Sequence, residues 1–213
     1  MTTVTVVDYG LGNLFSVSRA LEQVGAAIEL SDSAGVIDRA THLVLPGVGA
    51  FRDGMAGLRE RGLVEPVRRY GESGRPFLGI CLGMQLLFEW SAEFGREEGL
   101  GLMKGGVEAI PATGTDGRPH KIPHIGWNEL RLPPSRQAWT GTPFEELKPG
   151  TPAYFVHSFT AVPAEPSDRL ADAYYDGCVI SAAVGRDALI GCQFHPEKSG
   201  PAGLRILESF VRT

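Results

Sequence analysis

The sequence predicts an α/β protein with an open, mostly parallel β-sheet flanked by helices and an added antiparallel section in its C-terminal half. In the first hundred residues, short β-branched or apolar runs alternate with stretches of helical periodicity, which is typical of βαβ units. After Gly101, glycine and proline become frequent, and strand-like runs follow one another without clear helices between them. The 213 residues contain no internal repeat or low-complexity linker, so we expect a single domain, 1–213.

Buried strands are expected in the N-terminal half at residues 3–8, 27–30, 41–45 and 77–80. Between the first two, apolar residues from Leu14 to Val24 recur at the spacing of one helical face. A single helix is expected after Asp53, with an apolar face that continues from Met55 to Val67. Strands and helices of these lengths favour parallel pairing.

Further strands are expected in the C-terminal half at residues 106–110, 125–132, 153–159, 171–175, 178–184 and 188–194. Asp176-Gly177 predicts a two-residue hairpin turn between two of them, and Gly185-Arg186-Asp187 a looser turn. Pro133–Pro143 is expected to be an exposed loop, and Gly203–Val211 a final helix.

The composition excludes several classes of protein. A net charge of −5 leaves no electrostatic footprint for nucleic acid. The first residues lack the basic region and cleavage site of a signal peptide, and no apolar run approaches the ~18 residues of a membrane span. Three cysteines without a regular framework suggest free thiols in a reducing compartment. We therefore expect a soluble cytoplasmic protein.

The segment around Cys81 predicts a nucleophile. Gly79 and Gly83 flank this cysteine where a strand-like run becomes a helical pattern, which is the cysteine counterpart of the Gly-x-Ser-x-Gly elbow. Glycines there allow strained dihedrals and close backbone approach, and the helix N-terminus favours the thiolate. A buried cysteine that acts only as a small hydrophobe is the alternative. The paired glycines favour the nucleophile.

His195 is the candidate partner for this thiol among the five histidines, because it follows the strand at 188–194 within His195-Pro196-Glu197. Side chains at i and i+2 lie on the same side, so Glu197 would bond one imidazole nitrogen while the other faces Cys81. Although a lone His-x-Glu is common in surface loops, the elbow makes it part of a coherent Cys-His-Glu triad.

An oxyanion hole is expected from backbone N–H groups. Leu82, immediately after the nucleophile, supplies one donor. A second is expected from Val48 or Gly49 in the turn Pro46-Gly47-Val48-Gly49, which follows a strand at the carboxyl edge of the sheet, where such sheets bind ligands. A plain glycine turn is the alternative.

Three segments together resemble the class I, triad-type glutamine amidotransferases: Gly79–Gln85, Pro46–Phe51 and Gln193–Lys198. Three more, Asp8–Leu14, Pro123–Asn128 and Tyr154–Phe159, resemble the glutaminase subunits of imidazole glycerol phosphate synthases of histidine biosynthesis. The resemblance covers essentially the whole chain and implies a flavodoxin-like, class I amidotransferase fold.

The resemblance implies that Cys81 attacks the side-chain amide of glutamine to give a γ-glutamyl thioester, while His195 transfers protons and Glu197 holds it. The implied glutamine-binding residues are Gly47, Gly49, Gln85, His157, Ser158 and Phe159. Ammonia would pass to a cyclase/synthase (β/α)8-barrel subunit, the partner in a heterodimer, which makes imidazole glycerol phosphate and aminoimidazole carboxamide ribotide. No cofactor is implied.

Four residues match positions that this family uses at its subunit interface: Asn13, Trp127, Asn128 and Lys198. Trp127 is equally compatible with a core aromatic. A solvated surface lysine is the alternative for Lys198, but its place one residue after Glu197 favours the interface. The two asparagines have turn or cap roles as their alternatives.

The remaining cysteines are expected to be structural. Cys192 lies on the opposite strand face from His195, and Cys178 begins a strand without histidine or glycine context. A zinc site is a weak alternative, in which His120 and His124 would be ligands only in principle, because paired ligand spacings are absent. No metal is expected.

Three other functions stay open from the sequence. One is a glutaminase that serves another synthase, for pyridoxal phosphate, anthranilate or GMP, against which Val48 between glycines and the segment His124–Asn128 argue. Another is a cysteine peptidase of the related α/β type. The third is a non-enzymatic module with a dead triad, which the intact Cys81, His195 and Glu197 disfavour.

Overall fold

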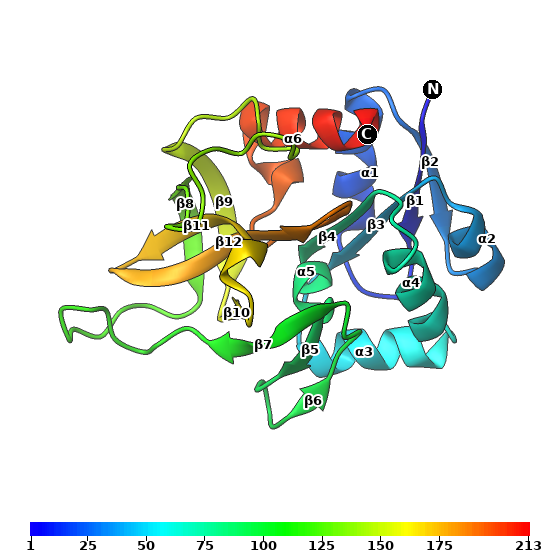
Figure 1. The fold of residues 1–213 in the computed structure, drawn as a ribbon. Helices are drawn as coiled ribbons and strands as arrows, with labels where there is room; N and C mark the ends of the chain where they lie inside the picture. The colour runs from blue at the N-terminus through cyan, green and yellow to red at the C-terminus, as the bar shows by residue number, and fades with distance from the viewer.

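The computed structural model describes residues 1–213 and is built on a seven-stranded sheet with the order β11-β12-β13-β4-β3-β1-β2 (Figure 1). Five strands, from β13 to β2, run parallel to one another, whereas β12 pairs antiparallel with both β11 and β13. Its strands are β1 Thr3–Val7, β2 Ala27–Ser31, β3 His42–Gly47, β4 Phe77–Cys81, β11 Arg169–Tyr175, β12 Cys178–Arg186 and β13 Leu189–Cys192. The predicted α/β class, with its antiparallel addition in the C-terminal half, is confirmed.

Helices cover both faces of this sheet (Figure 1). They are α1 Leu14–Gln23, α2 Ala34–Arg39, α3 Phe51–Glu60, α4 Val64–Gly71, α5 Leu82–Leu86 and α6 Gly200–Arg212, with 3-10 turns η1 Pro166–Asp168 and η2 Pro196–Lys198. Successive side chains of a strand point to opposite faces of the sheet, so the strands contribute to two apolar layers. In β3, Val44 lies in the layer under α1 and α6, whereas Leu43 and Leu45 lie in the layer under α3 and α4.

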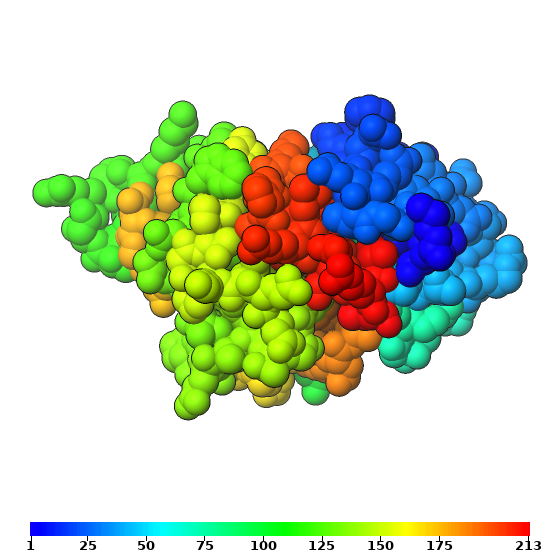
Figure 2. All heavy atoms as spheres, turned by 90° about the horizontal axis from the view of Figure 1, so that it is seen from above, coloured from blue at the N-terminus to red at the C-terminus, as the bar shows by residue number.

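Two smaller sheets adjoin the central one: the first lies against β11, and the second lies beside α5, α3 and β12. One is the antiparallel pair β8 His124–Leu130 and β9 Thr151–His157. The other has the order β10-β7-β5-β6, with strands β5 Phe88–Ser91, β6 Glu97–Glu98, β7 Met103–Ala109 and β10 Phe159–Pro163. Seen from above, α6 lies between the N-terminal part and the segment that holds β9, and it packs against both α1 and β9 (Figure 2).

The structure corrects the expected helix after Asp53, which is two helices. Gly62 has a φ of +66° between α3 and α4, a left-handed conformation that ends the first helix. The segment expected as one strand at 153–159 is also interrupted, because β9 ends at His157 and β10 starts at Phe159. The loop Pro133–Pro143 is only partly exposed, since Trp139 is buried and donates to the Leu170 carbonyl at 2.6 Å.

The Asp176-Gly177 turn is confirmed. Both residues have positive φ, +46° and +80°, which is the conformation that a two-residue hairpin requires between β11 and β12. No helix combines the length and the apolar character that a membrane crossing requires.

Candidate active site

Cys81 occupies the sharp turn between β4 and α5, as the sequence predicts. The strain lies on the cysteine itself, whose φ of 54° and ψ of −111° are rare for a residue with a side chain. Gly79 and Gly83 are required for close approach instead: a Cβ on Gly83 would lie 1.8 Å from the Leu45 carbonyl oxygen, and one on Gly79 2.8 Å from the Gly83 oxygen. The elbow therefore packs α5 closely against β3, and the Cys81 thiol lines a cavity at the edge of the sheet.

His195 and Glu197 come together immediately after β13. Nδ1 of His195 lies 2.8 Å from Oε1 of Glu197, and both side chains are almost fully buried. The His195 backbone N–H donates to the Tyr154 carbonyl at 2.9 Å, which fixes the imidazole against β9. Nε2 has no other hydrogen-bond partner and is free to exchange a proton with Cys81.

The electrostatics of His195 keep it protonated. Burial lowers its pKa, but interactions with the Cys81 thiol and the Glu197 carboxylate outweigh that effect and raise the pKa to about 9. In this ion pair the imidazolium already holds the proton of the thiol, so the sulfur is a thiolate and His195 can donate that proton to a leaving group. This arrangement suits nucleophilic attack on a carbonyl carbon, followed by protonation of the leaving group.

A cavity of about 360 Å³ opens above Cys81, within the size range of small-molecule sites. Its lining residues are Val48, Gly49, Cys81, Leu82, Gln85, Glu93, Pro123, Val156, His157, Ser158, Phe159 and His195. The cavity thus gathers nearly every residue that the sequence singled out for catalysis or glutamine binding. Glu197, which bonds His195, and Gly47 are not among the lining residues.

The turn after β3 is anchored from below by Tyr9. Its hydroxyl donates to the Pro46 carbonyl at 2.7 Å, and a Cβ on Gly47 would lie only 2.3 Å from that hydroxyl oxygen. Val48 is half-exposed at the cavity wall, and Gly49 has a φ of +100°. Gly47 is therefore a packing residue, which leaves Val48 and Gly49 as the part of the turn that faces the cavity.

Gln85 and Gln193 form the polar floor beside the nucleophile. Nε2 of Gln85 donates to the Phe159 carbonyl at 3.2 Å and to Oε1 of Gln193 at 2.9 Å. Nε2 of Gln193 in turn lies 3.8 Å from the sulfur of Cys81. Sequence reasoning missed Gln193, although its place two residues before His195 puts both on one strand face.

Glu93 is the carboxylate that lines the cavity, and it too was missed. Its Oε2 accepts from the Phe51 N–H at 2.7 Å, so it caps the first turn of α3 from a loop 42 residues away in sequence. No motif surrounds it, and only the fold brings it to the site.

His157 forms part of the cavity wall in a neutral form. Its Nδ1 lies 2.8 Å from the Phe159 carbonyl oxygen, and its Nε2 lies 3.0 Å from Nδ1 of His124. Burial lowers the pKa of His157 to about 4, an effect that the Phe159 hydrogen bond opposes and the nearby His124 and His195 increase. The ring is therefore uncharged at neutral pH.

The four candidate interface residues lie outside the cavity. Trp127 is 58% exposed, which removes the core-aromatic alternative, and Lys198 is exposed on η2. Asn13 caps α1 by accepting from the Ser16 N–H at 3.2 Å, so its cap alternative holds as a structural role. Asn128 is half-buried and donates to the Tyr174 carbonyl at 2.9 Å.

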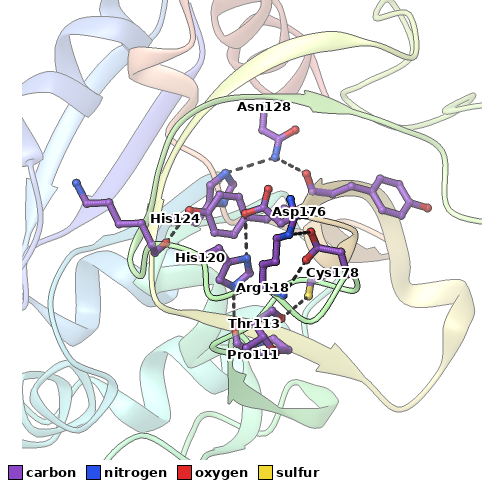
Figure 3. A network of polar contacts seen from close by, with 12 residues as sticks. Pro111, Thr113, Arg118, His120, His124, Asn128, Asp176 and Cys178 are labelled. Carbon is purple, nitrogen blue, oxygen red and sulfur yellow. Dashed lines mark hydrogen bonds and ion pairs between the residues drawn. The ribbon is translucent and has the colours of Figure 1, made fainter.

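Neither of the other cysteines approaches a catalytic base. Cys192 is fully buried, and burial raises the pKa of its thiol. Cys178 faces the Thr113 carbonyl oxygen at 3.5 Å (Figure 3). His120 bonds Asp176 and Pro111 instead of a metal-ligand set, and no three histidine, cysteine or acidic side chains gather anywhere in a form that could hold a metal ion.

Residues 5–213 match the family model described as glutamine amidotransferase class-I. The fold and the site thus define a class-I glutamine amidotransferase. A curated relative, imidazole glycerol phosphate synthase subunit HisH 1 of Legionella pneumophila strain Lens, is 50% identical over 212 residues and covers 100% of both chains. The HisH subunit of Geobacillus thermodenitrificans strain NG80-2 is 48% identical, over 99% of this chain and 96% of its own. The chain belongs to this HisH family, the glutaminase subunits of imidazole glycerol phosphate synthase.

Solved structures agree at the level of the fold. The chain superimposes on PurLQS from Thermotoga maritima with a TM-score of 0.71 at 20% identity, over 99% of this chain and 98% of that one. A crystal structure of a glutamine amidotransferase gives a TM-score of 0.71 at 17% identity, over 98% and 99% of the two chains. Membership of the HisH family agrees with the first interpretation of the sequence, and not with a peptidase or with a glutaminase for another synthase.

Proposed function

We propose that this protein hydrolyses L-glutamine to glutamate and ammonia through Cys81, His195 and Glu197, and delivers the ammonia to a synthase barrel. The observation that carries the proposal is the cavity above Cys81, where a strained thiol, a protonated imidazole and a polar floor meet. Family membership supplies the reaction class, and the geometry of the cavity supports the proposed residues.

The first half-reaction forms a thioester. The Cys81 sulfur attacks the side-chain carbonyl carbon of glutamine, and the carbonyl oxygen becomes an oxyanion that the Leu82 N–H and the turn at Val48 and Gly49 stabilise. The C–N bond then breaks, and His195 gives its proton to the leaving nitrogen, so that ammonia departs.

Hydrolysis completes the cycle. The now neutral His195 takes a proton from water, whose oxygen attacks the thioester carbon. The C–S bond breaks, the sulfur leaves on Cys81 and glutamate is released. Glu197 keeps Nδ1–H of His195 directed toward the carboxylate, which aims Nε2 at the reacting atoms in both halves.

Recognition of the amino-acid end of the substrate falls to Glu93. The α-ammonium group of glutamine needs an anionic partner in a cavity, and Glu93 is the carboxylate in the lining. Oε2 of Glu93 accepts from the Phe51 N–H, which leaves Oε1 to accept from the ammonium group. Ser158 and Phe159 also line the cavity, and we propose that their backbone groups bind the carboxylate and the amide.

The proposed partner is a cyclase/synthase (β/α)8-barrel subunit, which the resemblance of the sequence implies; the relatives are named as subunits of imidazole glycerol phosphate synthase, which supports a partner subunit. A face suited to it lies beside the cavity. Trp127 and Ile125 project from the same side of β8 and are 58% and 53% exposed, and the half-exposed Val48 borders the cavity mouth. Exposed apolar groups of this kind mark association surfaces.

Ammonia release measured with 15N-amide glutamine tests the hydrolysis. We expect weak turnover by the chain alone, a large rise with the barrel partner and its nucleotide substrate, and none in Cys81→Ala. Peptide cleavage without glutamine turnover would overturn the proposal, as would full activity in Cys81→Ser.

Channelling has a separate readout in the same assay. Unlabelled ammonium is added in excess, and the 15N fraction of the product nucleotide is measured. Transfer between subunits predicts a product that keeps the label of glutamine. A product that carries the isotope ratio of the bulk solution contradicts delivery through the partner and leaves glutamine hydrolysis intact.

A further inference from the structure

A chain of hydrogen bonds leads from strand β8 through His124 and His157 to the wall of the glutamine cavity. Figure 3 shows its outer end, at Asn128 and His124. Nδ2 of Asn128 donates to the Tyr174 carbonyl at 2.9 Å, and its Oδ1 accepts from the Glu129 N–H at 2.8 Å. These two contacts fix which end of the amide is nitrogen. That nitrogen lies 3.4 Å from Nε2 of His124.

The direction of every bond in the chain follows from its inner end. The Phe159 carbonyl can only accept, so Nδ1 of His157 carries a proton. Because His157 is neutral, its Nε2 is a lone pair and must accept from Nδ1–H of His124, 3.0 Å away. Burial also lowers the pKa of His124, so its Nε2 is a lone pair that accepts from Asn128.

The His124 ring is held on both faces. It stacks on Phe155 at 5.1 Å and on Tyr175 at 4.2 Å between ring centroids, and it is buried. On the far side of Tyr175, His120 stacks at 4.6 Å but belongs to a separate set of bonds with Asp176 and Pro111 (Figure 3). Nothing in the glutaminase chemistry uses His124 directly.

The chain continues from His157 into the polar floor of the site. The Phe159 carbonyl that accepts from His157 also accepts from Nε2 of Gln85, which bonds Gln193 beside the Cys81 sulfur. The position of this one carbonyl therefore depends on two donors, and the side-chain hydrogen bond that orients one of them, His157, comes from His124.

We propose that His124 is a positioning residue for the glutamine cavity: by donating from Nδ1 to Nε2 of His157 it is the second of the two contacts, beside the Phe159 carbonyl, that select the Nδ1–H form of His157 and hold its ring. His157 in turn holds the Phe159 carbonyl and the cavity wall in the form that binds substrate. This inference rests on the proposed function, because the wall it positions is the glutamine site. His124 touches no reacting atom, and its effect falls on binding.

Imidazole 15N NMR of the full chain at pH 7 tests the tautomer, with the five histidines assigned from single substitutions. We expect His157 in the Nδ1–H form with an unprotonated Nε2. His124→Phe keeps the stacking ring and removes the donor, so both tautomers of His157 should then be populated. His124→Asn offers an amide N–H near the former Nδ1 and should restore the Nδ1–H form.

Kinetics of the complex with the barrel partner supply the second readout. One lost hydrogen bond predicts that His124→Phe raises KM for glutamine about tenfold with kcat within about twofold, and that His124→Asn recovers most of the loss. His120→Gln is the matched control, since it removes the stacked ring on the other side of Tyr175 and leaves the chain of bonds intact. It should change neither readout.

An Nε2–H tautomer of His157 in the unsubstituted protein would overturn the inference, as would an unchanged KM in His124→Phe. If that variant does not fold, the unsubstituted spectrum and His124→Asn decide. Absence of glutamine turnover in the unsubstituted complex would instead contradict the proposed function, while the tautomer measurement on the chain would still stand.

Discussion

Cys81 combines reactivity with backbone strain, and the two can be separated by substitution. Its φ of 54° belongs to a region that costs a residue with a Cβ of order 1–3 kcal/mol and costs glycine little. Cys81→Gly and Cys81→Ala both remove the thiol and should both abolish glutamine turnover. We expect the glycine variant to be the more stable one, by about 1 kcal/mol in urea unfolding.

The comparison has a built-in reference, because alanine is ordinarily more stable than glycine in a helix or strand by roughly 0.5–1 kcal/mol. An alanine variant that matched or exceeded the glycine variant in free energy of unfolding would show that the elbow carries no strain at this position.

Two buried histidines give the site opposite dependences of stability on pH. The pKa of His195 is raised to about 9, so its contribution is complete below the unfolded value near 6.5 and is lost as pH rises toward 9. The pKa of His157 is lowered to about 4, so the folded state is destabilised as pH falls from about 6.5 toward 4. Their combined effect places a stability maximum near pH 6.5.

Urea unfolding at pH 5, 6.5 and 8.5 measures this effect. We expect His195→Gln to reduce the loss of unfolding free energy between pH 6.5 and 8.5, the alkaline limb, by about 1–2 kcal/mol. His157→Gln should reduce the loss between pH 6.5 and 5, the acidic limb, by a similar amount. Each variant controls for the other, because both lie in the same cavity wall. Loss of the same limb in both variants would contradict the assignment.

At the scale of the elements, the junction of α5 with β3 depends on a glycine that periodicity alone does not identify. A Cβ on Gly83 would lie 1.8 Å from the Leu45 carbonyl oxygen, a backbone atom inside the central sheet. Because neither the strand nor the elbow can move away cheaply, we expect Gly83→Ala to lower the free energy of unfolding by about 3 kcal/mol or more, measured in urea.

Gly35→Ala is the matched control. Gly35 lies in α2 with ordinary helical φ, and the nearest atom to its added Cβ is the flexible end of Arg39 at 3.4 Å. Because alanine has a higher helix propensity than glycine, Gly35→Ala should be neutral or should raise the free energy of unfolding by up to about 1 kcal/mol. Equal losses at both glycines would contradict the packing account of the elbow.

The elements that sequence reasoning missed are short or depend on one dihedral. α2 has six residues and one buried side chain, Ile37, which is too little for helical periodicity to identify. The apolar spacing from Met55 to Val67 passes through the break at Gly62, where a positive φ starts a new helix. Strands at the sheet core were predictable because β-branched and apolar runs there are bounded by glycine and proline.

The candidate site divides in the same way. Cys81, His195 and Glu197 were predictable because each sits in a local motif with a stated chemical need. Glu93 and Gln193 were not, since their roles arise only when the loop after β5 and the end of β13 fold over the same cavity. Motifs encode the reacting atoms, whereas the surrounding polar shell is a product of tertiary structure.

At the scale of the whole molecule, the cavity opens beside an exposed apolar face that the isolated chain leaves uncovered. Two grooves meet at Gly200: one is lined by Phe15 and Glu197, the other by Trp127 and Ser199. They connect the start of α1, the η2 turn and β8, three elements that carry the candidate interface residues. We expect the barrel subunit of the proposed function to dock on this face.

Trp127 is the residue on which association should depend most, because a large exposed aromatic at the centre of such a face is typical of a binding hot spot. We expect Trp127→Ala to raise the Kd for the barrel partner by about 30-fold or more, measured by isothermal titration calorimetry. Leu30→Ala is the control: Leu30 is 53% exposed on the edge strand β2, at the opposite end of the central sheet from β11, and its loss should leave the Kd unchanged.

The same pair of variants separates docking from catalysis. At partner concentrations that saturate Trp127→Ala, ammonia release should return to at least half of the unsubstituted rate, because the tryptophan lies outside the cavity and touches no group of the triad. If Trp127→Ala binds the partner normally but its ammonia release does not rise, Trp127 is instead needed for the activation of glutamine hydrolysis by the partner. A variant indistinguishable from Leu30→Ala in both measurements would move the interface to another face.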